Sequence, residues 1–147
     1  MKTAAPESAL ELANRLRPVL LQLNRQLRRE TRALGITAGQ ATFLHLIRTT
    51  PGIGAGALAE REGMSAPAMS GYVARLEAAG LVTRTRSGLD RRRVGLSLTP
   101  AGVRVLRAVR TRRTAWLAAR LEALAPGEQA AIDASIGPLA RLLETAP

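Results

Sequence analysis

The sequence predicts a mainly α-helical protein with one small β-ribbon, and three observations lead to this fold class. Hydrophobic residues make up 46% of the 147 positions and aromatic residues only 2%, so the core must consist of Leu, Ala and Val, which favours helices over a β-sandwich. Apolar residues recur at steps of three and four along most of the chain, as in amphipathic helices. Residues 81–86 and 94–98 instead alternate apolar and polar side chains, as half-buried strands do. A chain of this length forms one domain or a tightly integrated pair.

The first predicted helix begins near Ser8 and ends at Gly35. Its apolar stripe consists of Leu10, Ala13, Leu16, Leu20, Leu23 and Leu27. Further leucines and a valine widen the stripe, and such excess apolar surface indicates a partner chain. We expect Pro18 to kink this helix, because proline removes a backbone donor and clashes with the preceding turn. Four arginines give its second half a basic face: Arg25, Arg28, Arg29 and Arg32.

Three more helices are predicted before the ribbon. Thr37 is a good N-cap for a helix that Pro51-Gly52 ends. A short helix over 55–61 follows, and Glu62-Gly63 makes the turn into a helix over 65–79 that stops at a glycine. The residues predicted to face inward are Leu58, Ala59, Met69, Val73 and Leu76.

The remaining elements are the ribbon and two C-terminal helices. Residues 87–90 supply the tip between the two predicted strands. Thr99-Pro100 places an N-cap before a proline at the first helical position, which predicts a helix start. Pro126 opens a last helix, which we expect Gly137-Pro138 to interrupt.

The charge is strongly basic and gathers on the ribbon. The net charge is +11, and Lys2 is the only lysine among 22 basic residues. A GC-rich coding sequence would also inflate arginine, so clustering carries more weight than the total. Five arginines lie within residues 84–93 against a single acid, Asp90. Two helices joined by a tight turn and followed by a basic ribbon suit a DNA duplex, with the helix in a groove and the ribbon beside it.

Several classes of site are absent from the sequence. There is no cysteine, which excludes disulfides and thiolate metal sites, and His45 is the only histidine, so we expect no metal and no cofactor. No catalytic constellation is present, and we expect that the protein is not an enzyme. No stretch approaches the roughly 18 apolar residues of a membrane span, which predicts a soluble, intracellular protein.

Four stretches go beyond these patterns: Leu58-Ala59-Glu60-Arg61, 64–70, 73–82 and the run Asp90-Arg91-Arg92-Arg93, which a strand and Leu98-Thr99 follow. In these stretches the sequence resembles the MarR family of winged helix-turn-helix transcriptional regulators. The resemblance implies a single MarR-like domain over 1–147. The winged helix-turn-helix would occupy 36–99, and dimerisation helices would occupy 7–34 and 100–147.

The resemblance also implies a function. The protein would be a bacterial, cytoplasmic, nucleoid-associated homodimer that binds a pseudo-palindromic operator in double-stranded DNA. It would act as a repressor whose DNA affinity falls when a small aromatic or phenolic ligand binds. The family pattern pairs Asp90 with an arginine, and we favour Arg92 for the minor groove and Arg91 for a phosphate or bracing contact, since narrow A·T-rich grooves attract arginine.

The residues of the predicted recognition helix are unusual for direct reading of bases. Ser65 caps the helix, and the exposed amides beside it suit a phosphate oxygen. Arg75 is positioned for the DNA backbone, although it could also be an exposed residue that pairs with Glu77 or with nothing. Alanine, proline and glycine cannot make bidentate base contacts, so we expect specificity to depend on the wing, on DNA shape and on dimer spacing. The predicted DNA-binding residues are Ser65, Ala66, Pro67, Ala68, Ser70, Gly71, Arg75, Arg84, Arg86, Asp90, Arg91, Arg92 and Arg93.

The sequence selects a ligand site less sharply. Phe43 or Trp116 would line a cavity between the dimer helices and the winged unit, or both are hydrophobic filler at a helix interface. His45 would lie at the edge of that cavity, and Arg15 or Arg17 would meet an anionic ligand. Two other functions stay open: an architectural DNA-binding protein of low specificity, and a ligand-binding dimer that has lost DNA binding.

Overall fold

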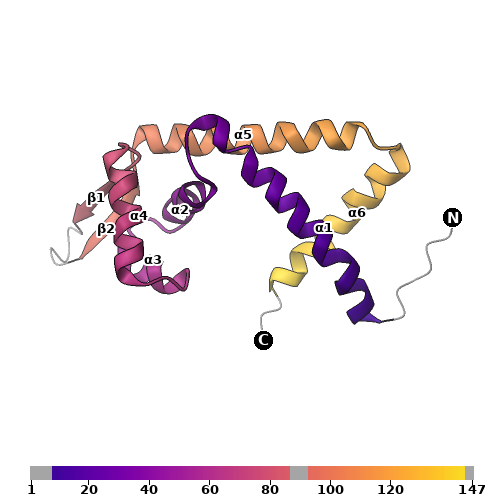
Figure 1. Ribbon diagram of the computed structural model, residues 1–147, viewed down its shortest axis with the longest axis horizontal. Coiled ribbons are helices and arrows are strands. Elements are labelled where there is room, and N and C mark those ends of the chain that lie inside the picture. The colour runs from indigo at the N-terminus through magenta and orange to yellow at the C-terminus, as the bar shows by residue number, and fades with distance from the viewer. Residues whose placement is uncertain (1–7, 87–92, 145–147) are drawn as a thin grey trace. The chain divides into compact units, whose positions relative to one another are not determined.

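Figure 1 shows a computed structural model, which describes residues 8–86 and 93–144. The elements are α1 (Ala9–Arg29), a 3₁₀ turn (Arg32–Leu34), α2 (Ala38–Thr49), α3 (Ala55–Arg61), α4 (Ala66–Ala78), β1 (Val82–Arg86), β2 (Val94–Leu98), α5 (Pro100–Glu122) and α6 (Pro126–Glu144). The predicted fold class, mainly helical with one β-ribbon, is confirmed. The chain divides between Arg113 and Thr114 into two compact units, which we describe separately.

Side-chain caps fix where the helices begin, as the sequence predicts. The Thr37 hydroxyl accepts a hydrogen bond from the Gln40 amide at 3.1 Å, and the Gln40 side chain accepts one from the Thr37 amide at 2.9 Å. This reciprocal capping box satisfies two backbone donors that the helix leaves unpaired. The Thr99 hydroxyl likewise accepts from the Gly102 amide at 3.0 Å, where α5 begins.

One predicted helix interruption is absent from the structure, and the first helix ends earlier than predicted. α1 runs through Pro18 without a break and ends at Arg29, and the following 3₁₀ turn ends at Gly35. The prediction that Gly137-Pro138 interrupts the last helix is wrong, because α6 is continuous from Pro126 to Glu144. Proline removes only one hydrogen bond of the ladder, and the alanines and leucines around it strongly favour the helix.

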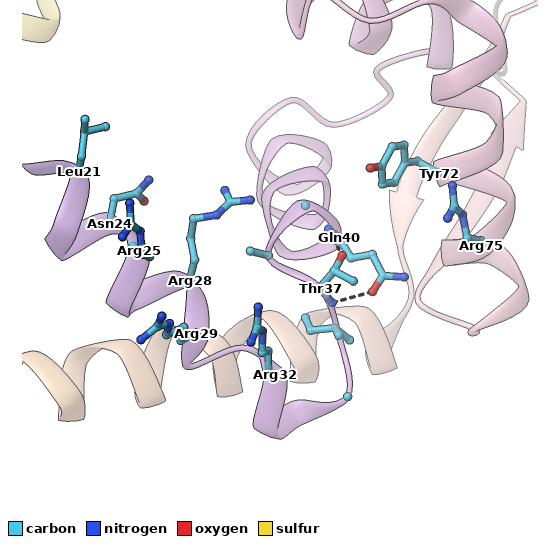
Figure 2. Close-up of a pocket in the computed structure, with 14 residues that line it drawn as sticks. Leu21, Asn24, Arg25, Arg28, Arg29, Arg32, Thr37, Gln40, Tyr72 and Arg75 are labelled. Atoms are coloured by element: carbon cyan, nitrogen blue, oxygen red, sulfur yellow. Dashed lines mark hydrogen bonds between the residues drawn. The ribbon is translucent and has the colours of Figure 1, made fainter.

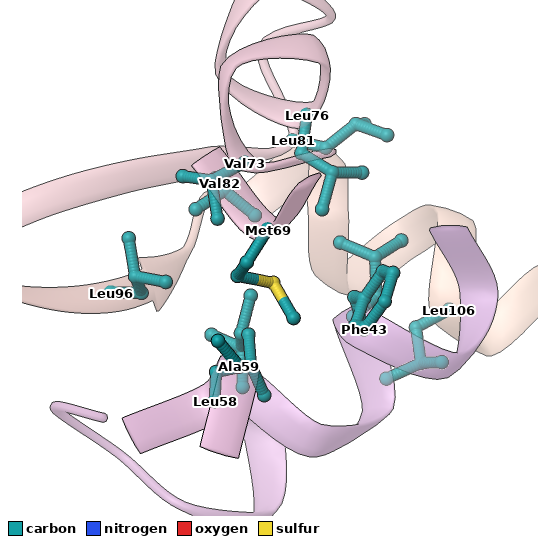
Figure 3. Packing of buried hydrophobic residues seen from close by; sticks show 12 residues of the cluster. Phe43, Leu58, Ala59, Met69, Val73, Leu76, Leu81, Val82, Leu96 and Leu106 are labelled. Carbon is teal, nitrogen blue, oxygen red and sulfur yellow. The ribbon is translucent and has the colours of Figure 1, made fainter. Parts of the chain in front are cut away.

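The hydrophobic core lies within the N-terminal unit, between α2, α3, α4, the ribbon and the start of α5 (Figure 3). Met69 occupies its centre and is fully buried, with Leu58 and Ala59 of α3 on one side and Phe43 of α2 on another. The predicted inward-facing residues of α3 and α4 are all buried. The helix-turn-helix therefore carries its own core. Its turn is made at Gly63, where φ is +62°, a conformation that side chains other than glycine rarely adopt.

The ribbon is an antiparallel pair in which Val82 lies opposite Leu98 and Arg86 opposite Val94. The segment before α3 joins its outer edge, since the Ile53 carbonyl accepts a hydrogen bond from the Leu96 amide at 2.9 Å. Gly95 is required at this crossing, because a Cβ atom there would lie 2.7 Å from the Gly52 carbonyl oxygen. The ribbon is thus anchored to the helix-turn-helix along its base.

By contrast, α1 and α6 contain no buried residue. Their exposed large apolar side chains are Leu10, Leu12, Val19, Leu20, Leu21 and Leu23 on α1, and Ile132, Ile136, Leu142 and Leu143 on α6. None of the helices in the described part of the chain is long and apolar enough to span a membrane. Among the described residues, much of the apolar surface of α1 and of α6 is therefore exposed.

Candidate nucleic-acid interface

The N-terminal end of α4 presents a capped and accessible helix start. The Ser65 hydroxyl accepts a hydrogen bond from the Ala68 amide at 3.3 Å, which confirms the predicted cap. Ala66, Pro67, Ala68 and Ser70 are all exposed, so this end of the helix is open to a partner. The short side chains here let a DNA duplex approach the backbone of α4 closely. Among these side chains, only serine can form a hydrogen bond to the duplex.

Further along α4, Arg75 is held in place by two neighbours one turn away or less. Its Nε donates to the Gly71 carbonyl at 3.2 Å, and its guanidinium lies over the Tyr72 ring, 4.8 Å from the centroid. The Tyr72 ring in turn contacts the buried Phe43 ring, with centroids 4.8 Å apart. Arg75 therefore projects from the core through a stack of side chains and stays exposed at its end.

Glu77, the only acid on α4, pairs with the wing strand and not with Arg75. Arg84 Nε donates to Glu77 Oε1 at 2.7 Å, a charge-assisted hydrogen bond between the recognition helix and β1. Arg84 was predicted as a DNA-binding residue, and its pair with Glu77 was not predicted. Seven residues and a change from helix to strand separate the two partners.

Arginines continue along the ribbon toward its tip. Arg86 and Arg93 are exposed at the ends of the paired region. The predicted tip residues Asp90, Arg91 and Arg92 lie outside the described residues. Ser65, Ser70, Arg75, Arg84, Arg86 and Arg93 thus belong to two adjoining elements, α4 and the ribbon, of one compact unit.

The four residues suggested for a ligand pocket lie in different surroundings. Phe43 is buried in the core against Tyr72, whereas His45 and Arg15 are exposed on α2 and α1. Trp116 belongs to the C-terminal unit, where its ring lies 4.8 Å from the Arg120 guanidinium.

The N-terminal unit does contain an open groove of about 980 Å³, between the second half of α1, the start of α2 and α4 (Figure 2). Its charged lining residues are Arg25, Arg28, Arg29, Arg32 and Arg75, and its polar ones include Asn24, Thr37, Gln40 and Tyr72. The basic face of α1 is visible in the sequence, but only the fold brings it to α4.

All the charged residues that line the groove are arginines. Burial, together with the neighbouring charge of Arg28, lowers the pKa of Arg113, whose Nε donates to the Leu27 carbonyl at 3.1 Å. Within residues 8–86 and 93–144, no group of three or more histidine or acidic side chains is placed to hold a metal ion.

Comparisons with known proteins agree with this geometry. Residues 34–93 match the sequence model of the MarR family. The chain is 31% identical to the HTH-type transcriptional regulator ML2140 of Mycobacterium leprae, over 80% of this chain and 82% of that protein. It is 29% identical to the regulator Mb0904 of Mycobacterium bovis, over 96% and 99% of the two chains.

The fold has close counterparts among solved structures. A putative transcriptional regulator from Pseudomonas aeruginosa superposes with a TM-score of 0.82 at 30% identity, covering 96% of this chain and all of that one. Tm0710 of Thermotoga maritima, also a transcriptional regulator, gives a TM-score of 0.76 at 28% identity, over 90% and 94%. The helix-turn-helix with its ribbon is therefore a winged helix, and the chain belongs to the MarR family of DNA-binding transcriptional regulators.

Proposed function

We propose that this protein is a homodimeric repressor that binds a pseudo-palindromic operator through α4 and the arginine-rich wing, and that a small-molecule effector releases it. One observation carries the proposal: an accessible, serine-capped helix and a basic ribbon adjoin each other in one compact unit. The N-terminus of α4 would enter the major groove, and the ribbon would follow the backbone beside it.

The side chains divide this work unequally. Ala66, Pro67 and Ala68 supply close approach and contact with thymine methyl groups, but no bidentate base contact. Arg75, Arg86 and Arg93 supply phosphate contacts, and Arg92 enters the minor groove. Specificity then depends on the wing, on DNA shape and on the spacing of two half-sites more than on the bases that face α4.

The uncovered apolar surface of α1 and α6 supports the homodimer. Leu10, Ile136 and Leu143 are 72%, 60% and 87% exposed, values that a core leucine or isoleucine does not reach. A second copy of the same helices would bury this surface in a two-fold interface, which is the commonest arrangement for soluble oligomers. Two winged units would then lie at a fixed spacing.

Selection of bound duplexes from a random library, followed by titration, tests the proposal. A specific regulator should enrich an inverted repeat and bind it about 10³-fold or more above random DNA at physiological salt. Arg92→Ala should cost more affinity than Ser70→Ala or any other single change within 66–71. A larger loss from a change within 66–71 would contradict the assignment of specificity to the wing.

The net charge of +11 and the plain recognition helix favour a second candidate, an architectural DNA-binding protein of the same fold. Such a protein would bind all duplexes with similar affinity and a steep dependence on salt, because phosphate contacts alone would hold it. Failure of the library to enrich any repeat, with binding still salt-sensitive, would favour this candidate.

A further inference from the structure

The ring of Tyr72, on α4, is held in place by α2. It contacts the ring of Phe43, with centroids 4.8 Å apart and ring planes tilted by 57°. Phe43 is buried in the core. The ring also lies close to Gly39, about one turn earlier in α2, since a Cβ atom there would be 3.8 Å from Tyr72 Cε1. Tyr72 is half-buried, and its ring is therefore fixed by a helix that is itself anchored in the core.

Arg75 lies against the same ring. Its guanidinium carbon is 4.8 Å from the ring centroid, and its Nε donates to the Gly71 carbonyl at 3.2 Å. The backbone of any helix offers such a carbonyl, whereas the aromatic ring is particular to this sequence. Figure 2 shows Arg75 beyond Tyr72 and the start of α2 as seen from the α1 arginines, so the tyrosine separates it from them.

Few other side chains can restrain Arg75. The residues about one helical turn before or after it are Gly71, Tyr72, Ala78 and Ala79. Three of them have no side chain larger than a methyl group. Within residues 8–86 and 93–144, no carboxylate is paired with Arg75, and the acid on α4, Glu77, pairs with Arg84 instead. The position of the exposed guanidinium therefore depends mainly on the tyrosine ring.

We infer that Tyr72 is a positioning residue for DNA binding, whose ring holds the Arg75 guanidinium where it meets a backbone phosphate. This inference rests on the proposed function, in which Arg75 contacts phosphate. A guanidinium held over a ring keeps N–H groups in its own plane that are free to donate to phosphate oxygens. Arginine otherwise has much side-chain freedom to lose on binding, and a side chain that is already ordered loses less.

A double-mutant cycle tests this coupling, with DNA affinity measured by fluorescence anisotropy at constant ionic strength. Phosphate contacts do not depend on base sequence, so any duplex that the protein binds serves as the probe. Arg75→Ala should weaken binding about tenfold, because a charge-assisted contact is lost. Tyr72→Leu removes the ring but keeps apolar bulk, and should weaken binding about two- to fivefold, the strength of an exposed cation–π contact.

The double variant Tyr72→Leu/Arg75→Ala decides the cycle. It should bind DNA as Arg75→Ala does, because the side chain that the ring positions is already gone. Tyr72→Phe keeps the ring and should bind DNA like the wild type. Urea titration of each variant checks that the winged unit remains folded.

Arg86→Ala supplies the matched control cycle. Arg86 is also exposed and is also proposed to contact phosphate, but it lies at the end of β1 and not on α4. The losses from Tyr72→Leu and Arg86→Ala should therefore add, since the two residues share no partner. Equal coupling in the two cycles would mean that Tyr72→Leu perturbs the whole winged unit, and would overturn the inference.

A spectroscopic measurement checks the position of Arg75 without replacing Tyr72. The ring current of Tyr72 should shift the side-chain proton resonances of Arg75 upfield in the nuclear magnetic resonance spectrum, and Arg75→Ala identifies these signals by their loss. The upfield shift should persist when the duplex is added. Its disappearance on DNA binding would mean that Arg75 leaves the ring to reach the phosphate, and would refute a positioning role.

The remaining outcomes separate the inference from the proposed function. If Tyr72→Phe weakens binding as much as Tyr72→Leu, the hydroxyl contacts DNA itself. If Tyr72→Leu tightens binding, the ring withholds Arg75 from DNA. If Tyr72→Leu costs the same affinity with and without Arg75→Ala, the two residues act independently. Each result overturns the positioning role and leaves the proposed function standing, whereas a wild type that binds no duplex refutes both.

Discussion

The winged unit and the terminal helices differ in how far their apolar side chains are buried. In the winged unit, Leu44, Leu58 and Leu76 are fully buried by residues of the same chain. In α1 and α6 no residue is buried, and Leu143 is 87% exposed. The same leucine-rich composition therefore serves two purposes. One region is stabilised by its own core, and the other exposes apolar surface that the proposed dimer would bury.

The largest effect is expected from breaking the core of the winged unit. Leu76→Ala should lower the free energy of unfolding by about 2–5 kcal/mol, because it leaves a cavity beneath the recognition helix. Urea titration measures this loss. Leu10→Ala, at a position that is 72% exposed, is the matched control and should cost far less at a given protein concentration. Equal losses of unfolding free energy in the two variants would mean that α1 contributes as much to the stability of the chain as the core of the winged unit does.

The next effect should appear in assembly and leave the winged unit folded. Leu20→Glu combined with Leu23→Glu puts two charges on the apolar face of α1 and should weaken self-association by about 100-fold or more, since buried unpaired charges are costly. Sedimentation velocity over a range of concentrations measures it, with Gln22→Glu as the control for added charge. A dimer that persists unchanged would show that this face is not the interface.

The smallest effect concerns the ion pair between Glu77 of α4 and Arg84 of β1. Glu77→Gln removes a negative charge near DNA, so simple electrostatics predicts tighter binding. If the pair with Arg84 instead positions the wing, affinity should fall, by about threefold given the modest strength of exposed ion pairs. Fluorescence anisotropy with a selected duplex decides the sign. Glu62→Gln, at an exposed position in the preceding turn, should bind DNA no more weakly than the wild type.

Local chemistry made much of the fold predictable. The α3 bounds, the Thr37 and Ser65 caps and the start of α5 at Pro100 each follow from residues a few positions apart. Helical periodicity identified the buried residues of α4 for the same reason.

What could not be predicted depends on contacts between elements far apart in the sequence. The Glu77–Arg84 pair needs the angle between α4 and β1, which no spacing rule provides. The groove needs Arg28 and Arg32 of the first helical segment beside Tyr72 and Arg75, and only tertiary packing sets that proximity. Phe43 was predicted either to line a ligand cavity or to fill a helix interface, and the structure places it in the core.

The Thr99 hydroxyl connects the end of α4 to the start of α5. Thr99 Oγ1 donates to the Gly80 carbonyl at 2.6 Å and accepts from the Gly102 amide, while the Thr99 amide donates to the Leu81 carbonyl at 3.0 Å. Hydrogen bonds to Thr99 thus connect the end of α4 directly to the first turn of α5. Because these hydrogen bonds join the end of α4 to the start of α5, we expect a rotation of the first turn of α5 to turn α4 with it.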